Sequence, residues 1–563
     1  MSIATEANPD KVFLEALEQA FEDSNKDFAR AYYLFATAKL SETYNSQEIY
    51  ARYPVLSQED TFRQLKVLYD RNPADEETKR MFTSVLETYI GAQVAELSDE
   101  FQNLKNKLTI DVADMGLKQP NGETLTQLLY EDVTEWLKKI SEKPIRQTLY
   151  DRMAQAYTEN LSQRYIDLFQ IQNKMLANLG YPDVIGFYAK TSGHHLRKLG
   201  ENGKKLVEET QEKYHQRMSA LYEAKTGLNF DETATRADIL YVLHSESEET
   251  KAIDQRFPQS KLVPLARQTF DGLGLSFSEV ATEVDFADVQ TYQREVVDKT
   301  DHPTHNGMPL RRILLDITNR EGKRSRAYVY PAAVPSEIYL SVKPEGGLDD
   351  YSAFFHESGH ALHFAYENPE LSYARALMGN NTTTETYAYL FQNLFLNRHW
   401  LRHMAGLSES EARLAVQQRA LEDLYMLRRY ASKMQFELHL FEGVNEPGYS
   451  LEDKGEIYAK ILTQGAGFRY DPEGWTRDVD AGFYVADYFT AWSLEAQLRE
   501  YLCSHFGKPE VQGEDWYLNP EAGKFLKALW ADGNIAQQDL SARIGYNDPT
   551  DVGPLLRLMA HNL

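Results

Sequence analysis

The spacing of apolar side chains predicts helices over most of the chain. From the amino terminus to about residue 250, long charged stretches carry apolar residues three and four positions apart, as in 75–108 and 143–181. This spacing puts the apolar side chains on one face of a helix. Similar patterns return at 408–443 and 486–506. We therefore predict a helical lobe over 1–250 and further helices near the carboxyl terminus.

A different pattern occupies residues from about 290 to 343. Short runs rich in β-branched and aromatic residues alternate there with Gly, Pro and Asn, which is typical of strands joined by turns. The runs lie at 312–317, 326–330 and 337–342. They predict one small sheet inside a catalytic region that we place at 251–563. Since no repeat or low-complexity linker interrupts the chain, we expect a compact body.

Charge and composition narrow the classes of partner. The chain has 60 Lys and Arg against 85 Asp and Glu, a formal net charge of −25, and no run of basic residues. Nucleic acid and anionic membranes are therefore not expected partners. The amino terminus lacks a basic start followed by an apolar stretch, and no segment approaches the roughly 18 apolar residues of a membrane span. With Cys503 as the only cysteine, we expect a soluble, cytoplasmic protein without disulfides.

The residues with the clearest chemistry follow the last predicted strand. A Gly-rich turn at 344–350 opens into an apolar helical segment, 351–366, that contains His356, Glu357 and His360. A step of four residues returns to nearly the same face of a helix, so both imidazoles can point at one ion. Catalytic zinc takes three protein ligands and leaves a position for water, and a neighbouring carboxylate can take that water's proton. The segment therefore predicts a zinc site with Glu357 as the general base.

The third ligand has to come from outside this pair. His363 lies too far along the same helix and is interpreted as a packing residue. Three acids remain as candidates: Glu367 and Glu370 at the end of the helix, and Glu385 at the start of a second apolar helical segment. A carboxylate at the buried start of a facing helix is well placed to complete such a site, which favours Glu385.

The motif His-Glu-Ser-Gly-His-Ala-Leu-His at 356–363 resembles the thimet oligopeptidase and oligoendopeptidase F family of zinc peptidases. The motif of that family is HExGHxxH, followed by a ligating Glu on the next helix. The resemblance implies one Zn²⁺ per chain, held by His356, His360 and Glu385. It extends through 428–438 and 482–502, and thus covers roughly residues 310 to 505.

The resemblance also implies groups that bind the substrate carbonyl and its oxyanion. Residues 483–490 resemble the family pattern FYxYxYxT, which assigns this role to Tyr484 and Tyr488. The match is incomplete. Ala486 stands where a Tyr is expected, and Asp478 or Asp480 occupies the stretch where the family usually has a His.

The family implies a mainly α, two-lobed gluzincin with a small sheet beside the zinc helix and a deep substrate channel. The implied activity is that of a zinc-dependent endopeptidase that cuts short unfolded peptides. We expect an extended peptide to pair with the backbone of one strand, at Glu337, Ile338, Tyr339, Leu340, Ser341 and Val342. No feature of the sequence predicts an oligomeric state.

Two other functions stay open. A helical zinc carboxypeptidase or dipeptidyl carboxypeptidase shares the ligand pattern, but it needs a basic group to capture the substrate carboxylate. A catalytically idle peptide-binding scaffold would keep the fold, and the departures near Ala486 favour that idea. Zinc content together with cleavage of a peptide library distinguishes the three.

Overall fold

The fold is described from a computed structural model, in which residues 8–39, 46–119, 121–245, 247–286, 289–300, 304–305, 308–324 and 326–563 are described. The chain divides into two units, each made of three stretches. Unit 1 comprises Met1–Tyr89, Glu249–Val416 and Ala491–Pro549, and unit 2 comprises Ile90–Glu248, Gln417–Thr490 and Thr550–Leu563. The stretch up to Tyr89 therefore groups with the later catalytic residues, which differs from the predicted lobe over 1–250.

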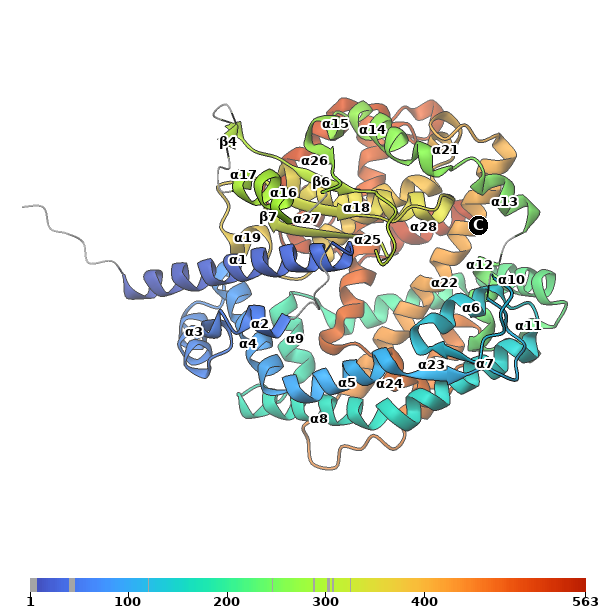
Figure 1. Ribbon diagram of the computed structural model, residues 1–563, viewed down its shortest axis with the longest axis horizontal. Helices are drawn as coiled ribbons and strands as arrows, with labels where there is room; N and C mark the ends of the chain where they lie inside the picture. The colour runs from blue at the N-terminus through green and yellow to red at the C-terminus, as the bar shows by residue number, and fades with distance from the viewer. Residues whose placement is uncertain are drawn as a thin grey trace, which may run out of the picture. The chain divides into compact units, whose positions relative to one another are not determined.

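Unit 1 combines helices with a four-stranded sheet (Figure 1). Its helices are α1 (Pro9–Ala36), α2 (Ser46–Tyr50), α3 (Glu59–Arg71), α4 (Glu76–Gln93), α13 (Glu248–Asp254), α14 (Leu262–Gly272), α15 (Phe277–Val280), α16 (Val289–Tyr292), α17 (Asp298–Thr300), α18 (Leu348–Tyr366), α19 (Tyr373–Ala376), α20 (Thr382–Gln392), α21 (Arg398–His403), α26 (Pro520–Trp530) and α27 (Gln537–Arg543). A two-stranded pair, β4 (Thr304–His305) with β5 (Met308–Pro309), also belongs to it.

The four-stranded sheet has the order β3-β6-β8-β7. Its strands are β3 (Ala281–Glu283), β6 (Ile313–Asp316), β7 (Tyr328–Ala333) and β8 (Glu337–Ser341). The strands β3, β6 and β8 are parallel, whereas β7 runs antiparallel to β8. Therefore β8 is an inner strand and β7 is an edge strand. The three strands predicted at 312–317, 326–330 and 337–342 are confirmed within a few residues at each end.

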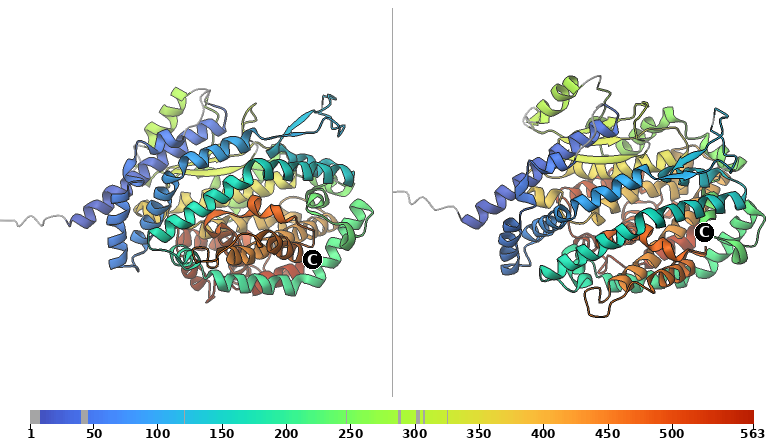
Figure 2. Two further views of the ribbon diagram at one scale, coloured as in Figure 1. Left: turned by 90° about the horizontal axis from the view of Figure 1, so that it is seen from below. Right: turned by 60° about the horizontal axis from the view of Figure 1, so that its bottom comes forward.

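Helices cover both faces of this sheet. Figure 2 shows α1 on one face and α18 on the other. On the α1 side, the ring of Tyr33 stacks on that of Tyr339 with their centroids 4.4 Å apart. Arg30 also donates two hydrogen bonds, of 2.9 and 2.7 Å, to the fully buried carboxylate of Glu337. This bidentate pair satisfies a charge that would otherwise be costly to bury.

Unit 2 is almost entirely helical. Its elements are α5 (Ala95–Lys107), β1 (Thr109–Asp111), β2 (Gln127–Leu129), α6 (Val133–Lys139), α7 (Lys143–Tyr157), α8 (Gln163–Asn178), α9 (Val184–Ser192), α10 (Leu196–Thr226), α11 (Phe230–Thr233), α12 (Ile239–His244), α23 (Lys454–Ala466), α24 (Trp475–Asp478) and α28 (Gly553–Asn562). Figure 2 shows the antiparallel β1–β2 hairpin standing out from the helices. This hairpin was not predicted.

Boundaries between the units fall inside helices: after residue 89 in α4, after the first residue of α13, and in two long helices later in the chain. The helix α22 (Glu409–Phe441) passes the boundary at residue 416, and α25 (Tyr484–Phe506) passes the boundary at residue 490. Both correspond to predicted helices, at 408–443 and 486–506. The mainly helical fold with small sheets confirms the predicted fold class. Among the described residues, no helix is long and apolar enough to cross a membrane.

Candidate metal centre and active site

The helix α18 carries the central residues of the site, and polar groups fix its first turn. The turn before it contains Gly346 and Gly347, which have φ of 100° and 95°. The backbone amides of Glu345 and Gly346 donate to the Asp350 carboxylate. The amide of Leu348 donates to the Asp254 carboxylate at 2.9 Å. Side-chain acceptors thus satisfy amides at a helix start, where partners within the helix are missing.

Gly359 allows α18 and α20 to approach each other closely. A Cβ atom at this position would lie 2.6 Å from the Ala388 Cα and 2.6 Å from the Tyr387 carbonyl oxygen. Only glycine leaves this space empty. The close approach brings Glu385, on the first turns of α20, to the face of α18 that carries the two histidines.

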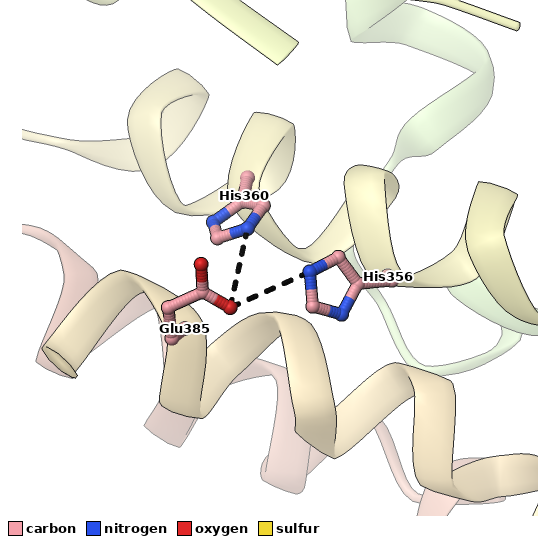
Figure 3. Close-up of side chains that lie close together, drawn as sticks. All are labelled: His356, His360 and Glu385. Carbon is pink, nitrogen blue, oxygen red and sulfur yellow. Dashed lines mark ion pairs between the residues drawn. The ribbon is translucent and has the colours of Figure 1, made fainter. Parts of the chain in front are cut away.

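The structure brings His356, His360 and Glu385 together (Figure 3). The Glu385 Oε2 atom lies 3.5 Å from His356 Nε2 and 3.9 Å from His360 Nε2. One ligand atom from each residue lies within 4.8 Å of the other two. The three side chains are largely buried, with exposed fractions of 17%, 12% and 10%.

Neighbouring side chains orient the two imidazoles. His360 Nδ1 lies 2.7 Å from the Thr384 hydroxyl, so that Nε2 faces Glu385. The ring of His356 packs edge-on against Tyr389, with centroids 5.2 Å apart. Burial, followed by the charges of His356 and His363, lowers the pKa of His360 well below its ordinary value. A neutral, oriented imidazole is the form that binds a metal.

The donor set fits zinc. Two imidazole nitrogens and one carboxylate oxygen converge from two helices, and three protein ligands of this kind are typical of catalytic zinc. Among the described residues, no other group of three His, Cys, Asp or Glu side chains has this spacing.

Glu357 follows the first histidine and is half-buried. Burial raises its pKa to about 7, against the opposing influence of the Arg326 guanidinium and the Val329 backbone. A carboxyl group with a pKa near neutrality can both take and return a proton at pH 7. This environment suits the predicted general base.

The two rejected ligand candidates near the end of α18 have different surroundings. Glu370 is exposed, as its position after the helix predicted. Glu367 is fully buried, which the sequence did not predict, and its carboxylate lies 3.6 Å from His363 Nε2. Burial raises the pKa of Glu367 well above its ordinary value. These two side chains form a separate buried pair, since the metal-ligand group does not include them.

Tyr484 and Tyr488 lie at the start of α25, in unit 2. The Tyr484 side chain is exposed, and the Tyr488 hydroxyl donates to that of Tyr484 at 3.4 Å. The Tyr488 ring also stacks on Tyr430, with centroids 5.7 Å apart. Between them on the helix, Asp487 pairs with the buried His194 at 2.6 Å. The oxyanion role of the two tyrosines stays a prediction.

Ion pairs hold the two aspartates, Asp478 and Asp480, that lie in the stretch where the resemblance implies a histidine. Asp478 pairs with Arg429 and accepts a hydrogen bond from Tyr458 at 2.8 Å. Although burial acts to raise the pKa of Asp478, Arg429 and other nearby cations lower it to about 2. Asp480 pairs with Lys433. Both aspartates therefore have structural partners within unit 2.

The expected substrate strand was wrong. The strand β8 is paired with β6 on one side and with β7 on the other, and all five of its residues are buried. Val342, just beyond it, donates to the Asp316 carbonyl. The backbone of 337–342 therefore cannot pair with a peptide. The two edge strands of this sheet are β3 and β7, and β7 is the one that pairs with β8.

Sequence reasoning missed three contributors to this region. Thr384, beside His360, belongs to a polar run, 382–384, directly before the predicted ligand Glu385, and that adjacency was an available signal. Arg326 and the edge strand β7 gave no such signal, because their importance depends on the order of strands in the sheet.

Comparisons with known proteins agree with this geometry. The sequence profile of peptidase family M3 matches residues 136–501. A second profile, that of angiotensin-converting enzyme, matches residues 4–226. A search of curated protein sequences found no match.

Proposed function

Because the chain belongs to peptidase family M3 and is a zinc metallopeptidase, we propose that it is an oligopeptidase, which cuts internal bonds of short unfolded peptides. The single observation that carries the chemistry is the convergence of His356, His360 and Glu385 beside Glu357. The preference for short unfolded peptides rests on the resemblance to thimet oligopeptidase and oligoendopeptidase F.

We assign the zinc ligands to His356, His360 and Glu385, with one ion per chain. Bound zinc would supply Lewis acidity, which polarises the scissile carbonyl and lowers the pKa of water. The protein contributes the orientation of the ligands, since Thr384 holds His360 and Tyr389 packs on His356.

Glu357 is the proposed general base and then the general acid. Its carboxylate takes the proton of the attacking water and delivers the same proton to the leaving amine. The raised pKa supports both steps, because a carboxyl with a pKa of about 7 is neither fully protonated nor fully ionised near neutral pH. Burial of the carboxyl group is the cause of that shift.

The proposed peptide-binding strand is β7. An edge strand offers unpaired backbone donors and acceptors, and an extended peptide can add to it as a further strand. The strand packs against α18, and the Val329 backbone lies near enough to Glu357 to affect its pKa. A peptide on this edge would therefore pass close to the base.

A mixture of quenched peptides tests the oligopeptidase assignment, with mass spectrometry to locate each cut. We expect cuts inside peptides whose two ends are both blocked, and cleavage that falls steeply for folded proteins. Equal rates on a folded protein and on a short peptide would refute the preference for short substrates.

A carboxypeptidase or dipeptidyl carboxypeptidase is the second candidate. The second profile match, to angiotensin-converting enzyme over residues 4–226, keeps this candidate open. Residues 4–135 of that match lie before the region that matches family M3, so the two matches are partly independent. Cleavage only of peptides with a free carboxyl terminus would favour it. Membership of a peptidase family argues against the idle scaffold.

A further inference from the structure

The connection between β6 and β7 carries four cationic side chains, and three of them have partners within unit 1. Arg320 pairs with Asp316 and Asp285. Lys323 is buried and donates to the Asp316 carboxylate at 2.9 Å. Arg324 donates to the Tyr32 hydroxyl at 2.8 Å and lies over its ring. These contacts fix the fold of the connection.

The fourth cation, Arg326, differs from the other three. Its side chain is exposed, and it makes no ion pair or hydrogen bond with the residues that the structure describes. It lies two residues before the start of the edge strand β7, which packs on α18. Its guanidinium interacts electrostatically with the Glu357 carboxylate. An exposed guanidinium without an internal partner thus lies at one end of the proposed peptide edge, near the proposed base.

The direction of β7 decides which end of a peptide would lie near Arg326. A peptide antiparallel to β7 has its carboxyl end at the start of that strand, whereas a parallel peptide has its amino end there. The guanidinium attracts a carboxylate and repels an ammonium group. The charge of Arg326 therefore favours the antiparallel direction, with the substrate's carboxyl end at the start of β7.

Spacing along the strand limits how far the carboxylate lies from the cleaved bond. Val329, whose backbone acts on Glu357, follows Arg326 by three residues. At about 3.3 Å per strand residue, this separation is about 10 Å. An arginine side chain shortens the gap, so the carboxylate would follow the cleaved bond by one to three residues.

We propose that Arg326 binds a carboxylate of the peptide substrate, the terminal one or an acidic side chain, one to three residues beyond the cleaved bond. This inference rests on the proposed peptidase function. It adds a determinant of substrate choice and of binding direction. It also supplies the basic group that a carboxypeptidase mode requires.

The test uses three peptides labelled at the amino terminus. One ends in a free carboxylate and the second in an amide. The third ends in a glutamate whose α-carboxyl group is amidated, so that only its side chain carries a carboxylate. The zinc-loaded wild type should cleave the free acid with a kcat/KM about 5- to 50-fold above that of the amide, mainly through KM. Cleavage of the third peptide at the rate of the first would identify any carboxylate, and not the terminal one alone, as the group bound.

Variants test whether the preference for a carboxylate comes from Arg326 itself or from the loss of any one surface charge. Arg326→Gln should abolish the preference, measured as the ratio of kcat/KM for the acid to kcat/KM for the amide, while Arg326→Glu should reverse it. This ratio cancels the effect of the lost charge on Glu357, which acts on both peptides alike. Arg63→Gln is the matched control, because Arg63 is an exposed arginine on α3 that pairs with Glu59. This control should keep the wild-type preference. Thermal unfolding should not change in any of these variants.

Two results would overturn the proposal: a wild type that cleaves neither carboxylate-bearing peptide faster than the plain amide, or an Arg326→Gln variant that keeps the preference. Either leaves the peptidase function standing if the peptides are cut. If the zinc-loaded wild type cuts none of them, the peptidase function fails. Fluorescence anisotropy with the same labelled peptides then decides the inference, which requires tighter binding of the acid to the wild type than to Arg326→Gln.

Discussion

Replacement of Gly359 by alanine perturbs the site through the spacing of two helices. The added Cβ would lie 2.6 Å from both the Ala388 Cα and the Tyr387 carbonyl oxygen, whereas ordinary contact begins at 3.4 Å. Relief of this overlap requires α18 and α20 to separate by about 0.8 Å. Neither partner can rotate away, because both are backbone atoms.

The displacement exceeds what a zinc site tolerates. Protein ligands hold zinc within about ±0.2 Å of their preferred distances. Since Glu385 lies on α20 and the histidines on α18, the separation pulls the carboxylate away from both imidazoles. We expect zinc affinity to fall at least about 10- to 100-fold, the range seen when a residue that supports a ligand is lost. Overpacking should also cost about 1–3 kcal/mol in the free energy of unfolding.

Competition with a chromophoric chelator measures the zinc affinity, and thermal unfolding of the zinc-free protein measures the packing cost. Gly91→Ala is the matched control, because Gly91 lies on α4 with no atom within 4 Å of its added Cβ. This control should gain about 0.5–1 kcal/mol from helix propensity. A Gly359→Ala variant with wild-type zinc affinity would refute the reasoning that close helix approach assembles the site.

Three further substitutions test single residues. Glu385→Gln should release zinc on dialysis, whereas Glu367→Gln should retain it, because Glu367 contacts His363 and not the metal ligands. Metal analysis of both variants checks this. The reverse result would identify Glu367 as the third ligand. Thr384→Val removes the hydroxyl beside His360 Nδ1 and should weaken zinc binding about 10- to 100-fold in the same competition assay. An unchanged affinity would show that the hydroxyl is dispensable. Tyr488→Phe should lower kcat and kcat/KM equally, by about 2–4 kcal/mol in transition-state energy, without loss of zinc. Wild-type turnover would mean that the family pattern does not extend to this segment.

The helix that carries the two histidines could be predicted because its pattern is local. Four residues separate His356 from His360, and helical periodicity alone puts both on one face. The choice of Glu385 as the third ligand depended on the resemblance to a known family, because the residues alone left Glu367 and Glu370 as alternatives. The structure adds a physical reason, which is the contact between α18 and α20 at Gly359.

The substrate strand could not be chosen from the sequence. Four of the six residues at 337–342 are apolar, Glu337 and Ser341 being the exceptions, and such a run is compatible with a strand buried on both faces. Which strand lies at an edge depends on pairing between distant segments, here β6 with β8 and β7 with β8. The pattern within one segment does not determine the order of the strands in the sheet.

The grouping of the chain also depends on distant contacts. The helix α1 has the same amphipathic pattern as the helices after residue 90, yet it packs on the sheet formed after residue 280. Its partners Tyr339 and Glu337 lie some 300 positions away. Helical periodicity predicts that a face is buried, but it does not identify what buries it.

The most direct test of the central claim compares zinc content and peptide cleavage in the wild type and in Glu357→Gln. Glutamine fills nearly the same space as glutamate but cannot take a proton from water. The account predicts about one zinc per chain in both proteins, with cleavage lower by about 10²–10⁴-fold in the variant. A wild type that binds no zinc at saturating metal, or a Glu357→Gln variant with nearly wild-type cleavage, would contradict it.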